Sequence, residues 1–302
     1  MKILIVGGTG MIGGHAAEYL NARGNEITLA ARKPAPEGTP MTRYPTLIGD
    51  YTKGDFTETD LAAFDAIVFA AGNDIRHLPK GTDENAFWKT MQIEGVPNFV
   101  AVAKRAGVKR VVQISSYYHH VMPHLIAENA YVRARHLADA GARALATPDF
   151  NVSTLNPPSI VGAIPGIAAK RYETLAAWGR GERPDIPDYA PTGGTNYMSV
   201  RSLCEAIWGA LQNAESGKAY LIGDENLTFR EFFQKFIDAA GGQRKLIEID
   251  KESPLLPDAF IVPGRGKVLA YEPDPAETAL LGYRRHDVSR AVAEVIAAVG
   301  AG

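Results

Sequence analysis

The sequence predicts an α/β protein with a doubly wound parallel sheet and a smaller α+β lobe in its C-terminal half. Short apolar runs alternate with longer segments of helical periodicity in the first half of the chain, a pattern that is typical of βαβ units. A glycine-rich turn directly follows the first apolar run. After residue 156, Pro and Gly become dense and longer helical patterns follow, which indicates a second region of different architecture.

Composition limits the partners that this chain can have. Its 302 residues suffice for one large or two modest domains. We expect a sheet domain over residues 1–160 and a substrate-binding lobe over 161–302, with some later segments returning to the sheet. A formal net charge of −2 provides no basic field for nucleic acid or for an anionic membrane, so we expect neither as a partner.

Cysteine usage indicates a reducing environment. Cys204 is the only cysteine, so no disulfide can form within the chain and no cysteine-based zinc site is possible. The simplest expectation is the cytoplasm. The apolar run at residues 2–6 is too short for a signal peptide or a membrane span.

Six strands are expected in the first half, because each run is short, rich in apolar or β-branched residues, and bounded by turn residues. They cover residues 2–6, 27–31, 46–49, 66–70, 109–114 and 151–155. Helices are expected over 11–23, 83–106 and 128–146, the second being kinked or split at Gly95 and Pro97. The second half predicts helices over 168–178, 200–214, 228–240 and 287–299, with an irregular Pro-rich segment over 251–275. Ligands bind beyond the carboxyl ends of such parallel strands.

A glycine-rich segment reads Gly-Gly-Thr-Gly-Met-Ile-Gly from Gly7 to Gly13, between the first strand and the first helix. Its early glycines allow a tight turn and close approach of backbone to a pyrophosphate, and Gly13 lets the helix pack on the strand. The helix N-terminus offers free N–H groups and a partial positive charge to phosphates. This context predicts dinucleotide binding by Gly7, Thr9, Gly10, Met11, Ile12 and Gly13.

The end of the second strand favours NADP over NAD as the cofactor. NAD-preferring sites place a carboxylate there for the ribose 2′-OH, but this strand ends in Ala30-Ala31-Arg32-Lys33. Arg32 can instead pair with a 2′-phosphate and stack on adenine. We therefore expect Arg32 and Lys33 to bind NADP; two solvated surface charges are the alternative.

These motifs resemble the extended short-chain dehydrogenase/reductase superfamily, in its NAD-dependent epimerase/dehydratase-like branch, over nearly the whole chain. The similar segments are the glycine turn, Gly49-Asp50, Phe69 to Gly72, Val111 to Ser116 and Asn156 to Gly162. The resemblance implies a Rossmann fold and further cofactor contacts along it. These are Asp50 and Tyr51 at the adenine, Ala70, Ala71 and Gly72 at the adenosine ribose, Ser115 after the fifth strand, and Pro158 and Ile160 at the nicotinamide.

The same resemblance implies catalysis by Ser, Tyr and Lys, with the last two spaced Tyr-x-x-x-Lys on one helix. Tyr131 and Arg135 have this spacing here, which places both on one helix face. Tyr131 and Arg135 are also expected to contact the cofactor. Tyr131 would exchange a proton with the substrate oxygen, Arg135 would supply positive charge, and Ser116 would hold the oxygen. Ser115 is the second choice for that serine.

Two departures from the family pattern fall on proton transfer. Arg135 replaces the family Lys and cannot give up a proton. Gln92 stands where the family usually has an Asn that holds a water. Two alternatives therefore remain: an ordinary i, i+4 pair on an amphipathic helix, or Tyr117 or Tyr118 as the acid, with Arg135 a ribose ligand only.

Three histidines, His119, His120 and His124, follow Ser116 closely. Adjacent His side chains are expected to point in different directions, and no Cys or close carboxylate joins them, so we predict no metal site. The segment is interpreted as a loop at the mouth of the cleft, or as a capping loop without ligand contact. Phe87 and Trp88 on the long helix are expected in the core or at the seam of a possible homodimer.

The sequence thus predicts an NADP(H)-dependent oxidoreductase or epimerase/dehydratase. It would act on a small molecule, either a carbonyl or hydroxyl compound or a sugar nucleotide, by hydride transfer with Tyr as acid/base. The alternative is a non-catalytic NADP(H)-binding redox sensor, which the departures at Arg135 and Gln92 motivate.

Overall fold

The computed structural model describes residues 1–299, and these residues contain a seven-stranded parallel sheet. The chain divides into two compact units. Unit 1 comprises Met1–Pro157, Cys204–Ile222 and Asp274–Tyr283, and unit 2 comprises Pro158–Leu203, Gly223–Pro273 and the segment from Arg284 onward. The predicted doubly wound α/β class is confirmed. The first boundary lies at Pro157, close to the expected residue 160.

The sheet belongs to unit 1, and its strand order is β10-β6-β5-β4-β1-β2-β3. The bounds are β1 Lys2–Val6, β2 Glu26–Ala31, β3 Thr46–Ile48, β4 Ala66–Phe69, β5 Arg110–Ile114, β6 Asn151–Asn156 and β10 Ala219–Leu221. The chain fills one side of β1 with β2 and β3, then returns to β4 on the other side. The order therefore reverses between β1 and β4, and ligands of open α/β sheets bind at such a switch point.

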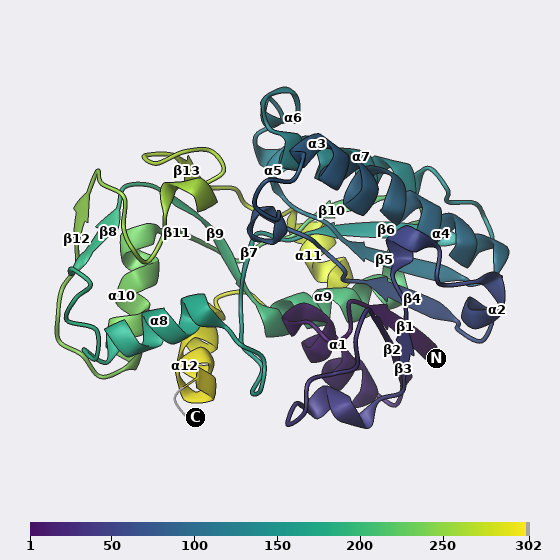
Figure 1. Ribbon diagram of the computed structural model, residues 1–302, viewed down its shortest axis with the longest axis horizontal. Coiled ribbons are helices and arrows are strands. Elements are labelled where there is room, and N and C mark those ends of the chain that lie inside the picture. Colours follow the sequence, from purple (N-terminus) through teal and green to yellow (C-terminus); the bar gives the residue numbers. More distant parts are fainter. Residues whose placement is uncertain (300–302) are drawn as a thin grey trace. The chain divides into compact units, whose positions relative to one another are not determined.

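Helices cover both faces of this sheet (Figure 1). The helices α4 and α7 lie on one face, where Phe99 and Ala138 pack against Phe69 and Val111. Figure 1 shows α1, α9 and α11 on the other face. The strand β1 is central, and Ile3, Leu4 and Ile5 are fully buried, as expected for a strand that is covered on both sides. Its apolar sequence thus follows from its place in the sheet.

The helical segments of unit 1 are mostly short. The α-helices are α1 Met11–Asn21, α2 Glu58–Leu61, α3 Glu84–Trp88, α4 Gly95–Arg105, α5 Tyr118–Val121, α6 Leu125–Glu128, α7 Ala130–Arg143, α9 Val200–Asn213, whose first turn is assigned to unit 2, and α11 Pro275–Leu281. The 3-10 helices are η1 Pro40–Arg43, η2 Tyr51–Lys53 and η3 Ile75–His77, and η4 Lys89–Glu94 is a π-helix.

Two segments from the second half of the sequence complete unit 1. The strand β10 pairs in parallel with β6, with Tyr220 opposite Leu155. The helix α9 is fixed by Arg110, whose guanidinium donates to Ala210 O at 2.9 Å. It also packs closely on α11, because a Cβ on Gly209 would lie 1.9 Å from Leu281 O. The sheet domain is therefore not one continuous stretch of sequence.

Unit 2 combines small sheets with three longer helices. Its strands are β7 Ser159–Val161, β8 Tyr189–Pro191, β9 Gly194–Ser199, β11 Glu225–Thr228, β12 Ile247–Ile249 and β13 Val268–Leu269. Its helices are α8 Lys170–Gly179, α10 Phe229–Ala239, α12 Val288–Val299 and the 3-10 helix η5 Asp258–Phe260. Aromatic residues fill its core, and the rings of Tyr197 and Phe232 stack with centres 3.9 Å apart.

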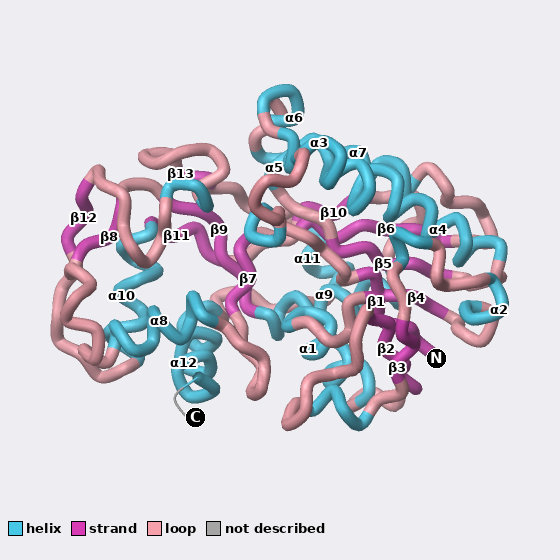
Figure 2. Tube along the Cα trace, viewed as in Figure 1, coloured by secondary structure: helices cyan, strands magenta, loops and turns pink. Residues whose placement is uncertain are grey.

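Two predicted helices differ from the observed ones. The expected helix over 83–106 consists of α3, the π-helix η4 and α4, so the irregularity precedes Gly95. The expected helix over 128–146 begins at Ala130 instead, because the Asn129 side chain caps α7 by accepting a hydrogen bond from Val132 N at 3.0 Å. Figure 2 shows the loops that join these helices and strands. Within residues 1–299, no helix has the length and apolar character needed to cross a membrane.

The contact between α1 and β1 generates a stability prediction. A Cβ on Gly13 would lie 2.3 Å from Gly7 O, and neither backbone can move without displacing the turn. Gly13→Ala should lower the free energy of unfolding in urea by about 2–3 kcal/mol. Gly24→Ala is the control, since Gly24 has φ +79° and open space around its Cβ position and should cost only about 1 kcal/mol. Equal losses in the two variants would contradict the steric account.

Candidate dinucleotide-binding and active site

The glycine turn presents an uncapped helix end at the switch point. Gly7 has φ +79°, and a Cβ there would lie 2.8 Å from Ala71 Cα, so only glycine fits between β1 and the end of β4. The α1 N-cap is Gly10, which has no side chain to bond the first N–H groups, and the first turn holds no acidic residue. Thr9, Met11 and Ile12 are partly exposed beside it. The turn can therefore accept an anionic group.

Two cations stand at the end of β2. The Arg32 and Lys33 side chains are exposed, and neither forms an ion pair in the described part of the chain, residues 1–299. The nearby Asp50 is engaged locally, because its Oδ1 accepts from Thr52 N at 3.0 Å and from Thr52 Oγ1 at 2.7 Å. The edge beside β2 therefore offers positive charge to a ligand.

The Tyr51 side chain is fixed by contacts within the protein and does not extend into solvent at the edge of the sheet. Its hydroxyl donates to Met91 O at 2.7 Å, and its ring meets the Phe69 ring edge-on, with centres 5.1 Å apart. Burial raises the pKa of Tyr51 far above its ordinary value, against the opposing effect of the Arg135 charge. Its phenol is therefore a hydrogen-bond donor at any ordinary pH, and it cannot serve as a base.

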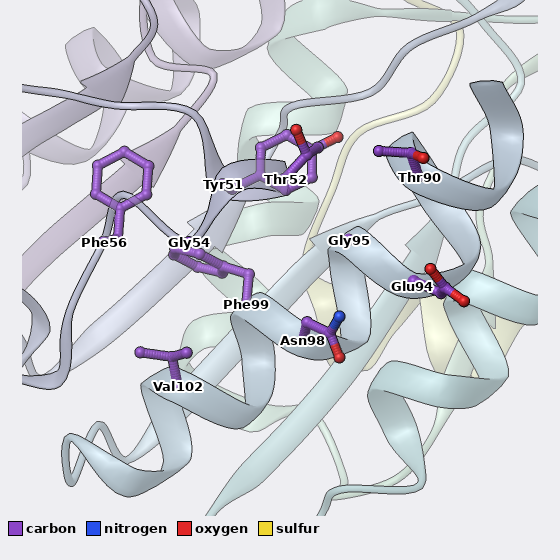
Figure 3. Close-up of a pocket in the computed structure, with 10 residues that line it drawn as sticks. All are labelled: Tyr51, Thr52, Gly54, Phe56, Thr90, Glu94, Gly95, Asn98, Phe99 and Val102. Carbon is purple, nitrogen blue, oxygen red and sulfur yellow. The ribbon is translucent and has the colours of Figure 1, made fainter. Parts of the chain in front are cut away.

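A cavity of about 170 Å³ lies between η2 and α4 (Figure 3). Phe56, Phe99 and Val102 give it an apolar side, and Thr90, Glu94 and Asn98 give it polar atoms. Of the residues predicted to bind the cofactor, Tyr51 lines it, whereas the glycine turn, Arg135 and the two serines do not. Most of the residues predicted to form the site thus lie outside this cavity, at the strand ends.

The predicted serines follow β5 and face buried surroundings. Ser115 and Ser116 are both 5% exposed. Ser115 N donates to Leu155 O at 2.8 Å, which extends the pairing of β5 with β6. Ser115 Oγ donates to Arg135 O at 3.5 Å, so this serine links the strand end to α7. Ser116, the first choice for the catalytic serine, lies one residue further on.

Tyr131 lies in the first turn of α7 and is 6% exposed. Its ring packs against Trp88 of α3, with ring centres 5.2 Å apart. Tyr118 meets the Tyr131 ring edge-on, with centres 6.3 Å apart, and its ring lies tilted against the Tyr117 ring, with centres 4.3 Å apart. Tyr117, Tyr118 and Tyr131, the three residues that the sequence offers as the general acid, thus form one aromatic cluster.

Arg135 is a buried cation without a carboxylate partner among the described residues. Its side chain donates to Ile114 O at 3.1 Å and to Gln92 Oε1 at 3.4 Å. A Cβ on Gly72 would lie 3.3 Å from Arg135 Nη1, so the guanidinium reaches the end of β4. The ordinary surface pair considered for Tyr131 and Arg135 is wrong, because both residues are buried.

The π-helix η4 brings Gln92 to this guanidinium. Gln92 is 1% exposed, and its Nε2 and the Nε of Arg135 have no hydrogen-bond partner in the described structure. At the end of β6, both amide atoms of the fully buried Asn156 are also without partners there. Buried polar atoms normally find a partner. These orphaned atoms and the uncapped α1 turn fit a polar, anionic ligand such as a dinucleotide.

The histidine segment is organised differently from the sequence expectation. Tyr118–Val121 form α5, and the adjacent His119 and His120 rings lie with centres 4.3 Å apart and a tilt of 40°. Both approach the buried carboxylate of Asp139, with His119 Nε2 at 3.1 Å and His120 Nε2 at 3.8 Å from Oδ2. The expectation that these side chains diverge and lack a close carboxylate is therefore wrong.

Asp139 and His119 have shifted pKa values. Burial alone would raise the pKa of Asp139, but hydrogen bonds from His119, His120 and Arg143 hold it far below its usual range. Burial lowers the pKa of His119, against the opposing effect of Asp139. Asp139 is therefore ionised, and His119 is neutral at neutral pH. Sequence reasoning missed Asp139, although its spacing of four residues from Arg135 places it on the same helix face.

Pro158 and Ile160 lie in unit 2 rather than in the sheet domain. Ile160 is part of β7, and its carbonyl accepts a hydrogen bond from the Tyr172 hydroxyl at 2.8 Å. Pro158 is buried. Their expected contact with the nicotinamide stays a prediction.

Residues 3–223 match the NAD dependent epimerase/dehydratase family. Because this match covers well over half of the chain, the protein belongs to that family, as its motifs predicted. Among curated proteins, a 3-beta-hydroxysteroid dehydrogenase of Mycolicibacterium neoaurum is 30% identical over 122 residues, which are 38% of this chain and 32% of that protein. The human epimerase family protein SDR39U1 is 39% identical over 75 residues, 25% of this chain and 22% of that protein.

The chain spans about a third of the length of that steroid dehydrogenase and about a fifth of SDR39U1. Solved structures resemble it over nearly its full length. The structure of gox2253 has a TM-score of 0.77 at 20% identity, covering 98% of this chain and 97% of that one. A UDP-glucose-4-epimerase from Stenotrophomonas maltophila, with bound NAD and formylated UDP-arabinopyranose, has a TM-score of 0.76 at 18% identity, covering 100% and 98%. At these identities the likeness establishes the fold.

The unpaired charge of Arg135 generates a second prediction. Arg135→Met removes an unpaired buried charge but leaves Ile114 O and Gln92 Oε1 without their donor, so it should lower the free energy of unfolding by about 1–3 kcal/mol. If a nicotinamide dinucleotide raises the melting temperature of the wild type, the same variant should lose that rise, because the Arg135 guanidinium reaches the ends of β4 and β5. Urea unfolding and thermal scans with and without NADPH measure both effects.

Arg110→Met is the matched control for this prediction. Arg110 is a half-buried arginine at the opposite end of β5, and it donates to Ala210 O. Its loss should destabilise the protein and leave the NADPH response intact. A large destabilisation in Arg135→Met together with a normal NADPH response would show that Arg135 is structural.

Proposed function

We propose that this protein is an NADP(H)-dependent oxidoreductase or epimerase/dehydratase that acts on a carbonyl or hydroxyl group, including one in a sugar nucleotide. The observation that carries the proposal is the convergence of the uncapped α1 turn, the buried Arg135 guanidinium and the two serines at the carboxyl ends of β1, β4 and β5. Membership of the NAD-dependent epimerase/dehydratase family supports the reaction class.

The chain's own residues would hold the cofactor along this edge. The N–H groups at Met11 to Gly13 would bind the pyrophosphate, and the exposed Arg32 and Lys33 would bind a 2′-phosphate. Asp50, with Oδ1 engaged by Thr52, would use its other oxygen toward the adenine. Gly72 leaves the Arg135 guanidinium open to a ribose hydroxyl, since no side chain intervenes.

Proton transfer at the substrate oxygen would rest on Tyr131. A tyrosine has an ordinary pKa of about 10, so work near neutral pH requires positive charge nearby, and Arg135 supplies it one helical turn away. Ser116 would hold the oxygen by a hydrogen bond. A bound nicotinamide supplies the hydride chemistry. Arg135 cannot release a proton, so it acts as a fixed charge, and the proton must leave Tyr131 by another route.

A non-catalytic NADP(H)-binding sensor is the second candidate, and one observation favours it. The Arg135 to Gln92 hydrogen bond lies where the family uses two groups in proton transfer. If this bond blocks the relay, the protein would bind the cofactor and not turn over. Tight NADPH binding without oxidation across a panel of aldehydes, ketones and UDP-sugars would support this candidate over the enzyme.

The cofactor proposal predicts a selective effect of Arg32. Arg32→Ala should weaken NADPH binding about 10- to 100-fold, the usual worth of a charge-assisted hydrogen bond, and leave NADH binding unchanged. Fluorescence titrations with both cofactors measure this. Lys109→Ala is the control, because Lys109 is exposed at the opposite end of β5 and should affect neither. A preference of the wild type for NADH would refute the 2′-phosphate assignment.

The catalytic proposal predicts that Tyr131 affects turnover and not binding. With a carbonyl substrate identified by NADPH oxidation, Tyr131→Phe should lower kcat at least about 100-fold and leave the Kd for NADPH nearly unchanged. Tyr118→Phe removes a neighbouring phenol of the same cluster and should have a much smaller effect. If Tyr131→Phe keeps full activity and Tyr118→Phe loses it, Tyr118 is the acid.

A further inference from the structure

One side-chain cluster in unit 1 plays no part in the proposed reaction. It consists of His119 and His120 of α5 and Asp139 of α7. One donor atom from each residue lies within 4.8 Å of the donor atoms of the other two. Two imidazole nitrogens thus approach a single carboxylate oxygen, at 3.1 and 3.8 Å from Asp139 Oδ2.

We propose that His119, His120 and Asp139 form a binding site for a divalent transition-metal ion of the Zn²⁺ class. Zinc bonds of about 2.1 Å in tetrahedral geometry place ligand atoms about 3.4 Å apart, and the two His–Asp separations bracket that value. Imidazole nitrogen with carboxylate oxygen is a donor set that suits Zn²⁺ and its neighbours rather than Mg²⁺ or Ca²⁺. Three protein ligands leave a fourth position for water.

The surroundings of Asp139 match those of a metal-binding carboxylate. Ligating carboxylates are themselves held by outer hydrogen bonds. Arg143 Nε donates to the other oxygen, Asp139 Oδ1, at 2.5 Å, and Arg143 Nη1 donates to Gly217 O at 3.1 Å. The carboxylate side chain is 0% exposed. Asp139 is thus fixed in orientation, with Oδ2 directed to the histidines.

The two histidines differ in exposure, which gives the site one closed and one open side. The His119 side chain is 4% exposed. The His120 side chain is 29% exposed, so an ion can enter from that side. Both imidazoles approach Oδ2, the oxygen that Arg143 Nε leaves open.

The position of the site suggests what an ion would do there. α5 begins two residues after Ser116, and α7 carries Tyr131 and Arg135. An ion that joins His119 and His120 to Asp139 would clamp the serine segment onto the helix that bears the tyrosine. Metal binding itself requires neither cofactor nor substrate, so its test does not depend on the proposed function.

The experiment is a titration of the full chain, free of affinity tag and treated with EDTA, with Co²⁺ and Zn²⁺. We expect one equivalent of Co²⁺ to bind with visible d–d absorption, and Zn²⁺ to displace it. His120→Ala should weaken Co²⁺ binding at least about 100-fold, since loss of outer partners alone costs 10- to 100-fold. His124→Ala, which removes an exposed histidine four residues away, should bind as the wild type does.

Asp139→Asn adds a second test, with folding checked by thermal unfolding. If it folds, it should lose Co²⁺ binding; if it does not fold, His120→Ala alone decides, because His120 is partly exposed and its removal leaves the core intact. Absence of saturable binding, or equal binding by wild type and His120→Ala, would overturn the proposal and leave the cluster as a buried ion pair.

Discussion

The backbone contact of Gly7 with Gly13 on one side and Ala71 on the other is the constraint on which the nucleotide edge depends. These three backbone segments approach so closely that no Cβ fits at either glycine. The contact fixes α1 against β1 and β1 against the end of β4. The strand order reverses at this same place, so the closest packing in the turn lies beside the crevice where parallel α/β sheets bind ligands. A rigid turn thus holds the uncapped end of α1 toward that crevice.

The two departures from the family pattern are coupled in the structure. Arg is longer than Lys, and Gln is longer than Asn, and here Arg135 and Gln92 meet each other. The forked guanidinium also holds Ile114 O at the end of β5, which a single ammonium could not do in the same geometry while serving Gln92. The pair therefore places a fixed charge that links α7, η4 and the sheet.

Much of unit 1 was predictable because its signals are local. Central strands can be recognised as short apolar runs. The glycine turn can be recognised because its backbone leaves no room for a side chain at Gly7 or Gly13. The helix face shared by Tyr131 and Arg135 follows from their spacing. The strand β10 was not predicted individually, since three residues carry no periodic signal and its pairing with β6 is long-range. The inward turn of His119 and His120 was missed because it depends on Asp139, twenty residues away from His119. The core of unit 2 depends on contacts between distant segments, which no local pattern encodes.

The π-helix η4 has a consequence for how related chains are compared. A π turn contains about one residue more than an α turn of similar rise. The segment Lys89–Glu94 therefore contains more residues than an α-helix of the same length would. Trp88 before it and Val96 after it are both buried, although a regular helix would present them at a different relative angle. Against a relative with a regular α-helix at this place, an alignment without a gap would shift one flank by a residue. The family position opposite Arg135 has to be assigned from coordinates, because counting along the chain can select the wrong side chain.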